Sequence, residues 1–368
     1  MIRLDEIREK EKRLRGLMKA KGLAGILLKR QANFSWLTAG GINLIGIATE
    51  MGGTAILVTE DAKYVLTTNV EASRMIQEEG VETLGFQVRT FPWWDDREGT
   101  IARELAGAGS LGCDLPYPNA VNVNEEIVRL RYSLTPAEIE RYRRLGEKVS
   151  RAAEKVLTKT KRGEKECAVI GRLSAELWKD RIDPIGVMGA ADERIANFRH
   201  CIPMEKPIER MFMLSVNARK GGLVVCLTRF VYFGKLPRKL KKQYADTVYV
   251  DCVMMANTRP GRPAREVFEK AIAAYAEKGY PEEWQLHHQG GPIGYQPRDY
   301  RAHFKTPDLV AENQPFCWNP SITGTKSEDT ILATVNGPEL ITHPVLFPTM
   351  KVEVEGIRFV RPAILELE

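Results

Sequence analysis

A seam at residues 131–136 constrains this chain more than any other feature, because the hydrophobic pattern differs on its two sides. The seam reads Arg-Tyr-Ser-Leu-Thr-Pro. Thr135 is a favourable N-cap, Pro136 suits the first helical position and Glu138 completes a capping box, which together predict a long helix reaching about residue 157. The chain has 368 residues, more than one ordinary domain holds. We therefore predict two domains, residues 1–132 and residues 133–368.

Short β-branched runs alternate with helical patterns before the seam. Their spacing predicts helices over 2–20, 70–79 and 100–106, and strands over 24–28, 54–58, 64–67, 84–89 and 111–114. Such alternation is typical of an α/β domain with a mixed sheet.

The pattern after the seam is of another kind. Two long strand-like runs, 211–218 and 223–233, are joined by the turn signal Arg219-Lys220-Gly221-Gly222. Helices are predicted over 164–178, 237–256 and 263–278, and strands over 314–320 and 329–335. This half is therefore expected to be an α+β domain.

Composition excludes several functional classes. The net charge is +6, but the charged residues of both signs are interspersed, so a solvated surface is expected and no nucleic-acid partner. The six cysteines stand singly without a C-x-x-C pair, which excludes a zinc knuckle and indicates a reducing compartment. The N-terminus is charged at once, and no apolar run approaches a membrane span of about 20 residues. We expect a cytoplasmic protein without a membrane partner.

Four segments occur in an order that resembles the creatinase/prolidase/aminopeptidase P (pita-bread) superfamily. Arg199 to Pro203 looks like the family's His-x-x-Pro segment, and 214–217 with 226–229 looks like the two strands that bear its paired aspartates. Residues 258–263 followed by Gly279-Tyr280 resemble its Arg-Pro-Gly…Gly-Tyr helix, and 319–320 with 327–330 its Glu-Pro and Ile-Glu-Asp-Thr segments. The resemblance implies an α/β N-terminal creatinase-like domain, an α+β pita-bread C-terminal domain, and a homodimer.

The same resemblance assigns metal ligands to positions that this chain fills differently. Family peptidases bind two divalent ions with Asp, Asp, His, Glu and Glu, whose oxygen and imidazole donors suit such ions. The matching positions here are Ser215, Cys226, Gly291, Asn319 and Glu328. One carboxylate cannot replace five ligands, so we expect neither a metal nor another cofactor. The glycine run 290–294 is expected to leave room where the family's imidazole stands.

Two residues are candidates for catalysis. His200 matches the histidine that creatinase, which also lacks the dinuclear site, uses as its acid and base, and imidazole suits this role because it titrates near neutral pH. Glu328 matches a position that faces the cavity and is expected to hold the substrate. The alternatives left open are that His200 only contacts the backbone and that Glu328 forms a salt bridge with an arginine such as Arg229.

Further polar residues are candidates for binding the substrate. His287 matches a substrate-contacting histidine of aminopeptidase P-like enzymes, His288 adjoins it, and Arg298 falls where the family has another histidine. Neutral hydrogen-bonding groups would complete an uncharged lining: Asn217, Thr228 and Asn319. Cys226 is open either as a nucleophile or as a small buried hydrophobe.

Three functions therefore remain open. The first is a metal-independent, creatinase-like hydrolase of a small amide or non-peptide C–N bond, with His200 as acid and base. The second is a metal-dependent Xaa-Pro aminopeptidase or dipeptidase. The third is a catalytically inactive pita-bread binding protein. For an enzyme, the expected partner is a small molecule or a short peptide-like substrate.

Overall fold

The computed structural model describes residues 2–368, which form two compact units. The N-terminal unit comprises the residues up to 138 together with 221–223, and the C-terminal unit comprises 139–220 and 224–368. The seam predicted at residues 131–136 lies at the end of the first unit. Its capping box is present, because the Thr135 N–H donates to Glu138 Oε2 at 2.7 Å and the Glu138 N–H donates to Thr135 Oγ1 at 3.3 Å.

The N-terminal unit is built around a six-stranded mixed sheet in the order β4-β3-β2-β1-β5-β6. The pairs β1–β2 and β2–β3 are antiparallel, and the other three pairs are parallel. The predicted α/β class with a mixed sheet is confirmed. The elements in chain order are α1 (Ile2–Lys21), β1 (Leu23–Arg30), α2 (Gln31–Leu37), β2 (Met51–Thr59), β3 (Lys63–Thr68), α3 (Ala72–Gln77), β4 (Gln87–Phe91), α4 (Glu98–Ala106), β5 (Ser110–Cys113), β6 (Ala120–Asn122) and α5 (Asn124–Leu130).

The C-terminal unit is built around an eight-stranded sheet with the path β10-β11-β14-β9-β8-β7, to which β15 adds beside β14 and β18 beside β9. Its first elements are α6 (Pro136–Leu157), α7 (Glu166–Trp178), β7 (Asp183–Ala191), α8 (Glu193–Asn197), β8 (Met211–Lys220), β9 (Leu223–Phe233), α9 (Arg238–Asn257), α10 (Ala264–Glu277) and the 3-10 helix η1 (Glu283–Leu286). Strands follow: β10 (Gly290–Pro292), β11 (Gln314–Trp318), β12 (Ser321–Ile322), β13 (Thr325–Lys326), β14 (Asp329–Thr334), β15 (Gly337–Leu340), β16 (Thr349–Val354), β17 (Ile357–Pro362) and β18 (Leu365–Leu367).

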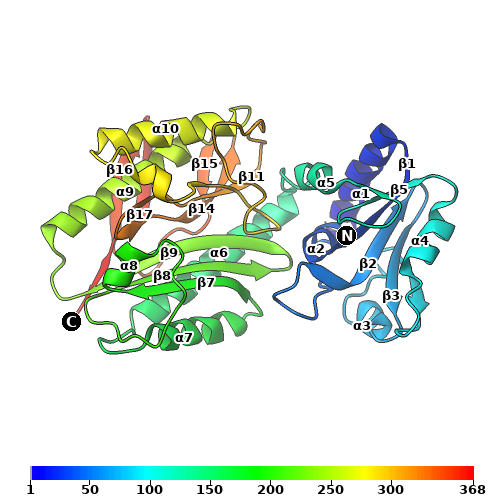
Figure 1. Ribbon diagram of the computed structural model, residues 1–368, viewed down its shortest axis with the longest axis horizontal. Coiled ribbons are helices and arrows are strands. Elements are labelled where there is room, and N and C mark those ends of the chain that lie inside the picture. Colours follow the sequence, from blue (N-terminus) through cyan, green and yellow to red (C-terminus); the bar gives the residue numbers. More distant parts are fainter. Residues whose placement is uncertain (1) are drawn as a thin grey trace. The chain divides into compact units, whose positions relative to one another are not determined.

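Helices cover the C-terminal sheet on both sides. In Figure 1, α9 and α10 run together along one side of the strands, and α7 lies on the other side beside β7. The main core lies under α9 and α10, where buried residues such as Met254, Tyr275 and Trp318 pack together. This layered α+β arrangement is the pita-bread fold that the resemblance implied, and its strands β8, β9, β11 and β14 bring the predicted site residues together.

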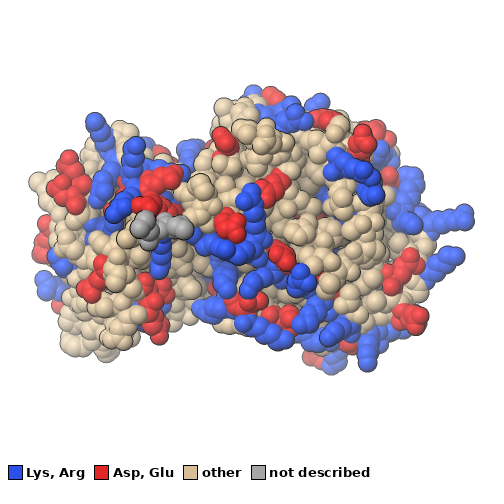
Figure 2. Space-filling model, turned by 180° about the vertical axis from the view of Figure 1, so that it is seen from behind, with Lys and Arg blue, Asp and Glu red and all other residues tan. Residues whose placement is uncertain are grey.

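The surface carries charges of both signs. On the face shown in Figure 2, Lys and Arg side chains lie among Asp and Glu side chains on each unit. Within residues 2–368, no helix is both long and apolar enough to span a membrane.

Candidate active site

Glu328 lies at the centre of the predicted site, where two neighbouring strands orient its carboxylate. Its Oε2 accepts hydrogen bonds from Ser215 Oγ at 2.9 Å and from Thr228 Oγ1 at 2.7 Å. Ser215 lies on β8 and Thr228 on β9, and the Thr228 N–H also donates to the Glu328 carbonyl at 2.9 Å. Two positions that the resemblance assigns to metal ligands, 215 and 328, therefore meet in space.

A cation supplied by the chain itself lies against the same carboxylate. Lys326, the last residue of β13, places Nζ 2.8 Å from Glu328 Oε2 and 3.3 Å from Ser215 Oγ. Burial opposes ionisation of Glu328, but the Lys326 ammonium and hydrogen bonds from Lys326 and Thr228 outweigh it and lower the pKa of Glu328 to about 2. Lys326 and Glu328 therefore form a buried ion pair at neutral pH.

Arg229, the alternative partner for Glu328, is engaged elsewhere. Its guanidinium is fully buried and lies 2.9 Å from both Glu154 and Asp329. A second buried arginine, Arg361, binds Asp329 at 2.9 Å and Asp251 at 2.7 Å. Two guanidinium groups thus hold the first residue of β14, and this fixes the backbone next to Glu328.

The remaining ligand positions, 226, 291 and 319, carry no carboxylate or imidazole that could bind a cation. Cys226 packs in a small apolar cluster that includes Val224, Ile293 and Cys317, which is the environment of a buried hydrophobe. Asn319 is buried, and its Oδ1 has no hydrogen-bond partner within the described residues 2–368. Gly291 lies on β10 opposite Cys317 of β11.

The expectation of an open space at Gly291 is wrong. A Cβ atom there would lie 2.3 Å from the backbone oxygen of Tyr300. The φ angle of Gly291 is +155°, which side-chain-bearing residues rarely adopt. The backbone of the segment around residue 300 therefore occupies the volume in which an imidazole at position 291 would have to begin.

Three histidines form a cluster next to the ion pair. His200 lies in the loop after α8, and its Nε2 is 3.2 Å from Nε2 of His287, the residue after η1. One ring nitrogen from each of His200, His287 and His288 lies within 4.8 Å of the others. His200 is exposed and His287 is 9% exposed. The structure therefore brings together three of the residues predicted for catalysis and substrate binding.

The environment keeps these imidazoles neutral. Burial lowers the pKa of His287 to about 2, and the nearby Lys326 adds to the effect. Burial followed by the charges of Arg298 and Arg301 lowers the pKa of His288 to about 4. The pKa of His200 is also lowered, first by partial desolvation of its ring, although the residue as a whole is exposed, and then by Lys326 and Arg301. A neutral imidazole has a lone pair with which it accepts a proton.

Arg298 and Asn217 lie at the edge of this arrangement. The Arg298 guanidinium donates to the backbone carbonyls of Gly291 and Cys317, which ties the turn after β10 to β11. Asn217 lies two residues after Ser215 on β8, opposite Gly186 of β7. Their predicted contacts with a substrate stay predictions.

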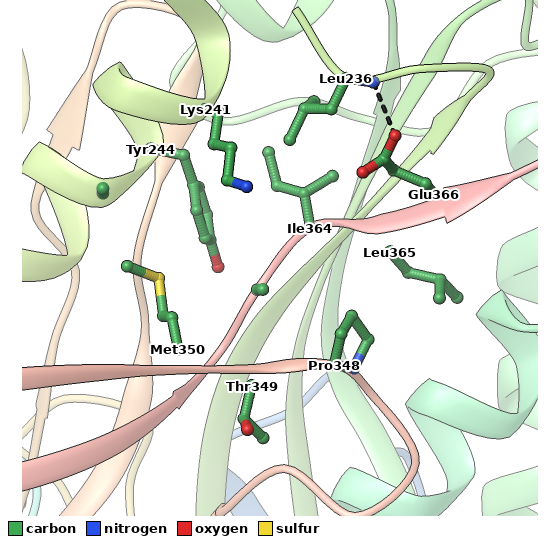
Figure 3. A pocket seen from close by; sticks show the side chains of 11 residues that line it. Leu236, Lys241, Tyr244, Pro348, Thr349, Met350, Ile364, Leu365 and Glu366 are labelled. Atoms are coloured by element: carbon green, nitrogen blue, oxygen red, sulfur yellow. Dashed lines mark hydrogen bonds between the residues drawn. The ribbon is translucent and has the colours of Figure 1, made fainter. Parts of the chain in front are cut away.

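Two cavities differ sharply in size. A cavity of about 10 Å³, the room of one water molecule, is lined at the site by His287 and Lys326 together with Phe198 and Met213. A larger cavity of about 530 Å³ lies elsewhere in the C-terminal unit, between α9 and the strands β16 and β18. Figure 3 shows its lining, with Lys241 and Tyr244 from α9 facing Ile364. None of the predicted site residues lines the larger cavity.

Sequence reasoning missed Lys326, although a signal was present. Lys326 and Glu328 are two residues apart at the junction of β13 and β14, and residues at i and i+2 of an extended chain point to the same side. A lysine at that spacing from a carboxylate expected to be buried is a candidate counter-ion.

The fold and this site define a two-domain protein of the creatinase/prolidase superfamily with a pita-bread C-terminal domain. Residues 11–143 match the Creatinase/Prolidase N-terminal domain, and residues 140–335 match Metallopeptidase family M24. The chain belongs to metallopeptidase family M24.

Relatives resemble the chain along nearly its full length. It is 23% identical over 359 residues to the uncharacterized peptidase YqhT of Bacillus subtilis (strain 168), covering 91% of this chain and 98% of that protein. It is 23% identical over 366 residues to the Xaa-Pro dipeptidase of Pyrococcus horikoshii, covering 92% and 98%. The structure of the Xaa-Pro dipeptidase from Bacillus anthracis superposes with a TM-score of 0.78 at 20% identity, covering 98% of this chain and 100% of that one. This last likeness concerns the fold.

Proposed function

We propose that this protein is a metal-independent hydrolase of a small amide or other non-peptide C–N bond, with His200 as acid and base. The observation that carries the proposal is the buried Lys326–Glu328 ion pair next to the His200–His287 hydrogen bond. In metal-assisted hydrolysis, a metal ion supplies positive charge and its bound water supplies an activated nucleophile. Here a fixed cation would supply the positive charge, and a neutral base would activate the water.

The residues present do not fit the dinuclear metal centre that the family name implies. The five ligand positions hold a hydroxyl, a thiol, a glycine, an amide and a carboxylate whose Oε2 already binds an ammonium. A divalent ion beside Glu328 would have to displace the Lys326 cation or stand close to it, and like charges repel strongly in a buried site. No step of the proposed reaction therefore involves such an ion.

The proposed reaction uses His200 for proton transfer. His200 takes a proton from water as the oxygen attacks the carbonyl or amidino carbon, and the neutral His287 orients the His200 ring through the 3.2 Å contact between the two Nε2 atoms. The tetrahedral intermediate then collapses as His200 returns the proton to the leaving nitrogen. Because His200 is exposed, a substrate can approach it from solvent.

Lys326 is proposed to supply the electrostatic part of catalysis. Its ammonium has three N–H groups, two of which are directed to Glu328 and Ser215. Lys326 and His287 line the same water-sized cavity, so an oxygen that develops negative charge there would face a preorganised cation. Glu328 holds the lysine in place through the 2.8 Å contact.

The test is hydrolysis by protein freed of metals with a chelator, using a panel of N-acyl amino acids, guanidino compounds and Xaa-Pro dipeptides. Turnover that persists in the chelator is expected, and His200→Ala should lower kcat by about 10²- to 10⁴-fold. His303→Ala, which removes an exposed histidine outside the cluster, is the matched control and should leave kcat unchanged. Unchanged turnover in His200→Ala would show the mechanism to be wrong.

The second candidate is the Xaa-Pro dipeptidase activity named for the relatives from Pyrococcus horikoshii and Bacillus anthracis. That activity would require divalent ions in the pocket. Elemental analysis of the native protein, with dipeptide hydrolysis measured before and after addition of Mn²⁺, tests it. Stoichiometric metal together with Mn²⁺-dependent cleavage would favour this candidate over the first.

The small cavity favours a third candidate, a protein that binds without catalysis. Ligand sites usually enclose about 300–1,000 Å³, whereas the cavity at His287 and Lys326 holds about 10 Å³. An inactive binding protein would turn over no member of the substrate panel, and His200→Ala would leave its ligand affinity unchanged.

A further inference from the structure

The three clustered histidines have the geometry of a metal site that is separate from the family's ligand positions. Two imidazole nitrogens bound tetrahedrally to one ion at about 2.05 Å stand about 3.3 Å apart. The Nε2 atoms of His200 and His287 are 3.2 Å apart. The third nitrogen, from His288, lies within 4.8 Å, so a side-chain rotation that moves it by about 1.5 Å completes three ligands on one ion.

The arrangement of His287 and His288 is unusual for consecutive residues. Successive side chains of an extended chain point to opposite sides, and the backbone at His287 is extended. The two rings nevertheless lie side by side, with centroids 4.3 Å apart and planes inclined by 31°. Nδ1 of His288 is buried and has no hydrogen-bond partner among residues 2–368, so this nitrogen gains a partner when a ligand binds.

The charges around the cluster restrict the kind of ion. Lys326 is already paired with Glu328 at 2.8 Å, and the positive charges of Arg298 and Arg301 act on His288. Hard ions that depend on carboxylates, such as Mg²⁺ or Mn²⁺, would find only neutral nitrogen donors here. Borderline ions accept imidazole readily, with Ni²⁺, Cu²⁺ and Zn²⁺ above Mn²⁺ in affinity.

We infer that His200, His287 and His288 bind one borderline divalent ion, such as Zn²⁺ or Ni²⁺, with its fourth position open to water or an anion. Arg301, which is exposed beside the cluster, favours an anion such as a carboxylate in that position. The ion takes the lone pair of His200, so under the function proposed above its binding inhibits hydrolysis rather than supporting it.

Direct binding measurements test the site without reference to activity. Calorimetric titration of the full chain with Ni²⁺ should give one site per chain, and His288→Ala should weaken binding by at least about tenfold. His343→Ala, which removes an exposed histidine elsewhere, is the matched control and should bind as the unchanged protein does. Arg301→Gln should tighten binding by about threefold because it removes a nearby positive charge.

Titration with Co²⁺ identifies the donor atoms. Nitrogen ligands give visible d–d bands alone, whereas a cysteine ligand adds a sulfur-to-cobalt charge-transfer band in the near ultraviolet. Visible bands that disappear in His288→Ala and persist in His343→Ala support the site. A charge-transfer band, no saturable binding, or equal affinity in His288→Ala overturns it.

The failure of this inference is distinguishable from the failure of the proposed hydrolase. Saturable Ni²⁺ binding that leaves turnover intact would keep the metal site and disprove the role of His200 as base. Persistent His200-dependent turnover without any Ni²⁺ binding would keep the hydrolase and disprove the site.

Discussion

The Lys326 ammonium and the Glu328 carboxylate form an ion pair at 2.8 Å, with 5% and 3% of their side chains exposed. Their charges are mutually dependent, because either group alone would be an isolated charge in a buried place. Removing one partner of a buried ion pair costs about 3–5 kcal/mol, whereas replacing both is often close to neutral.

Lys326→Met is therefore expected to lower the free energy of unfolding by about 3 kcal/mol, and Lys326→Met with Glu328→Gln should recover most of that loss. Urea unfolding of the single and double variants measures both values. Lys305→Met, at an exposed position, is the control and should change the free energy by less than about 0.5 kcal/mol. Equal losses in the single and double variants would refute the coupling between the two charges.

Restoring the family's imidazole at position 291 should fail. Gly291→His, and even Gly291→Ala, places a Cβ atom 2.3 Å from the Tyr300 carbonyl oxygen, so we expect a loss of about 2–4 kcal/mol in the free energy of unfolding. Gly171→Ala in α7 meets no atom within 4 Å and should instead stabilise the chain by about 0.5–1 kcal/mol. A Gly291→His variant of unchanged stability would contradict the close approach in the structure.

Acid should destabilise the protein through His287. The pKa of His287 in the folded chain is about 2, below the value of about 6.5 in an unfolded chain, so the unfolded state binds more protons between these values. Stability contributed by the neutral ring is present above pH 6.5 and is lost as the pH falls, by about 2 kcal/mol between pH 7 and pH 5.

The difference between wild type and His287→Gln isolates this contribution, because buried Asp251, with its pKa raised to about 6, acts in the opposite direction in both proteins. Unfolding free energies measured at pH 7 and pH 5 should fall less in His287→Gln than in wild type. The exposed His343→Gln should behave like wild type. A difference between wild type and His287→Gln that does not change with pH would contradict the prediction.

The buried arginine at the base of β14 should matter far more than one on the surface. Arg229→Met leaves Glu154 and Asp329 short of a counter-charge, and we expect a loss of about 3–5 kcal/mol in the free energy of unfolding. Arg143→Met removes a surface pair with Glu339 and should cost less than about 1 kcal/mol. Thermal and chemical unfolding of the two variants compare them, and similar losses would be evidence against a structural role for Arg229.

Local signals predicted the elements that depend on neighbouring residues. The Thr135–Glu138 capping box and the start of α6 at Pro136 follow from the seam as predicted. The strand predicted over 84–89 instead begins at Gln87, because Gly85, with φ of +82°, lies in a turn. Strand β7 was missed because its proline and two glycines, one of them opposite Asn217, hide a strand pattern.

The site was predictable as a set of positions but not as a set of interactions. The family resemblance placed Ser215, Thr228 and Glu328 in one pocket, and they meet there. That Lys326 rather than Arg229 neutralises Glu328 depends on how strands distant in sequence pack. The blocked space at Gly291 depends likewise on the path of the chain near Tyr300, which no local pattern reveals.

Arg229 and Arg361 both bind Asp329, so Asp329 has a structural role while the adjacent Glu328 belongs to the candidate active site. Asp329 anchors β14 through two guanidinium groups that make no use of its neighbour, so the side chain at 328 is free to change partners while the strand stays where it is. Point substitutions at position 328 can therefore change the chemistry of the site during evolution without changing the position of β14.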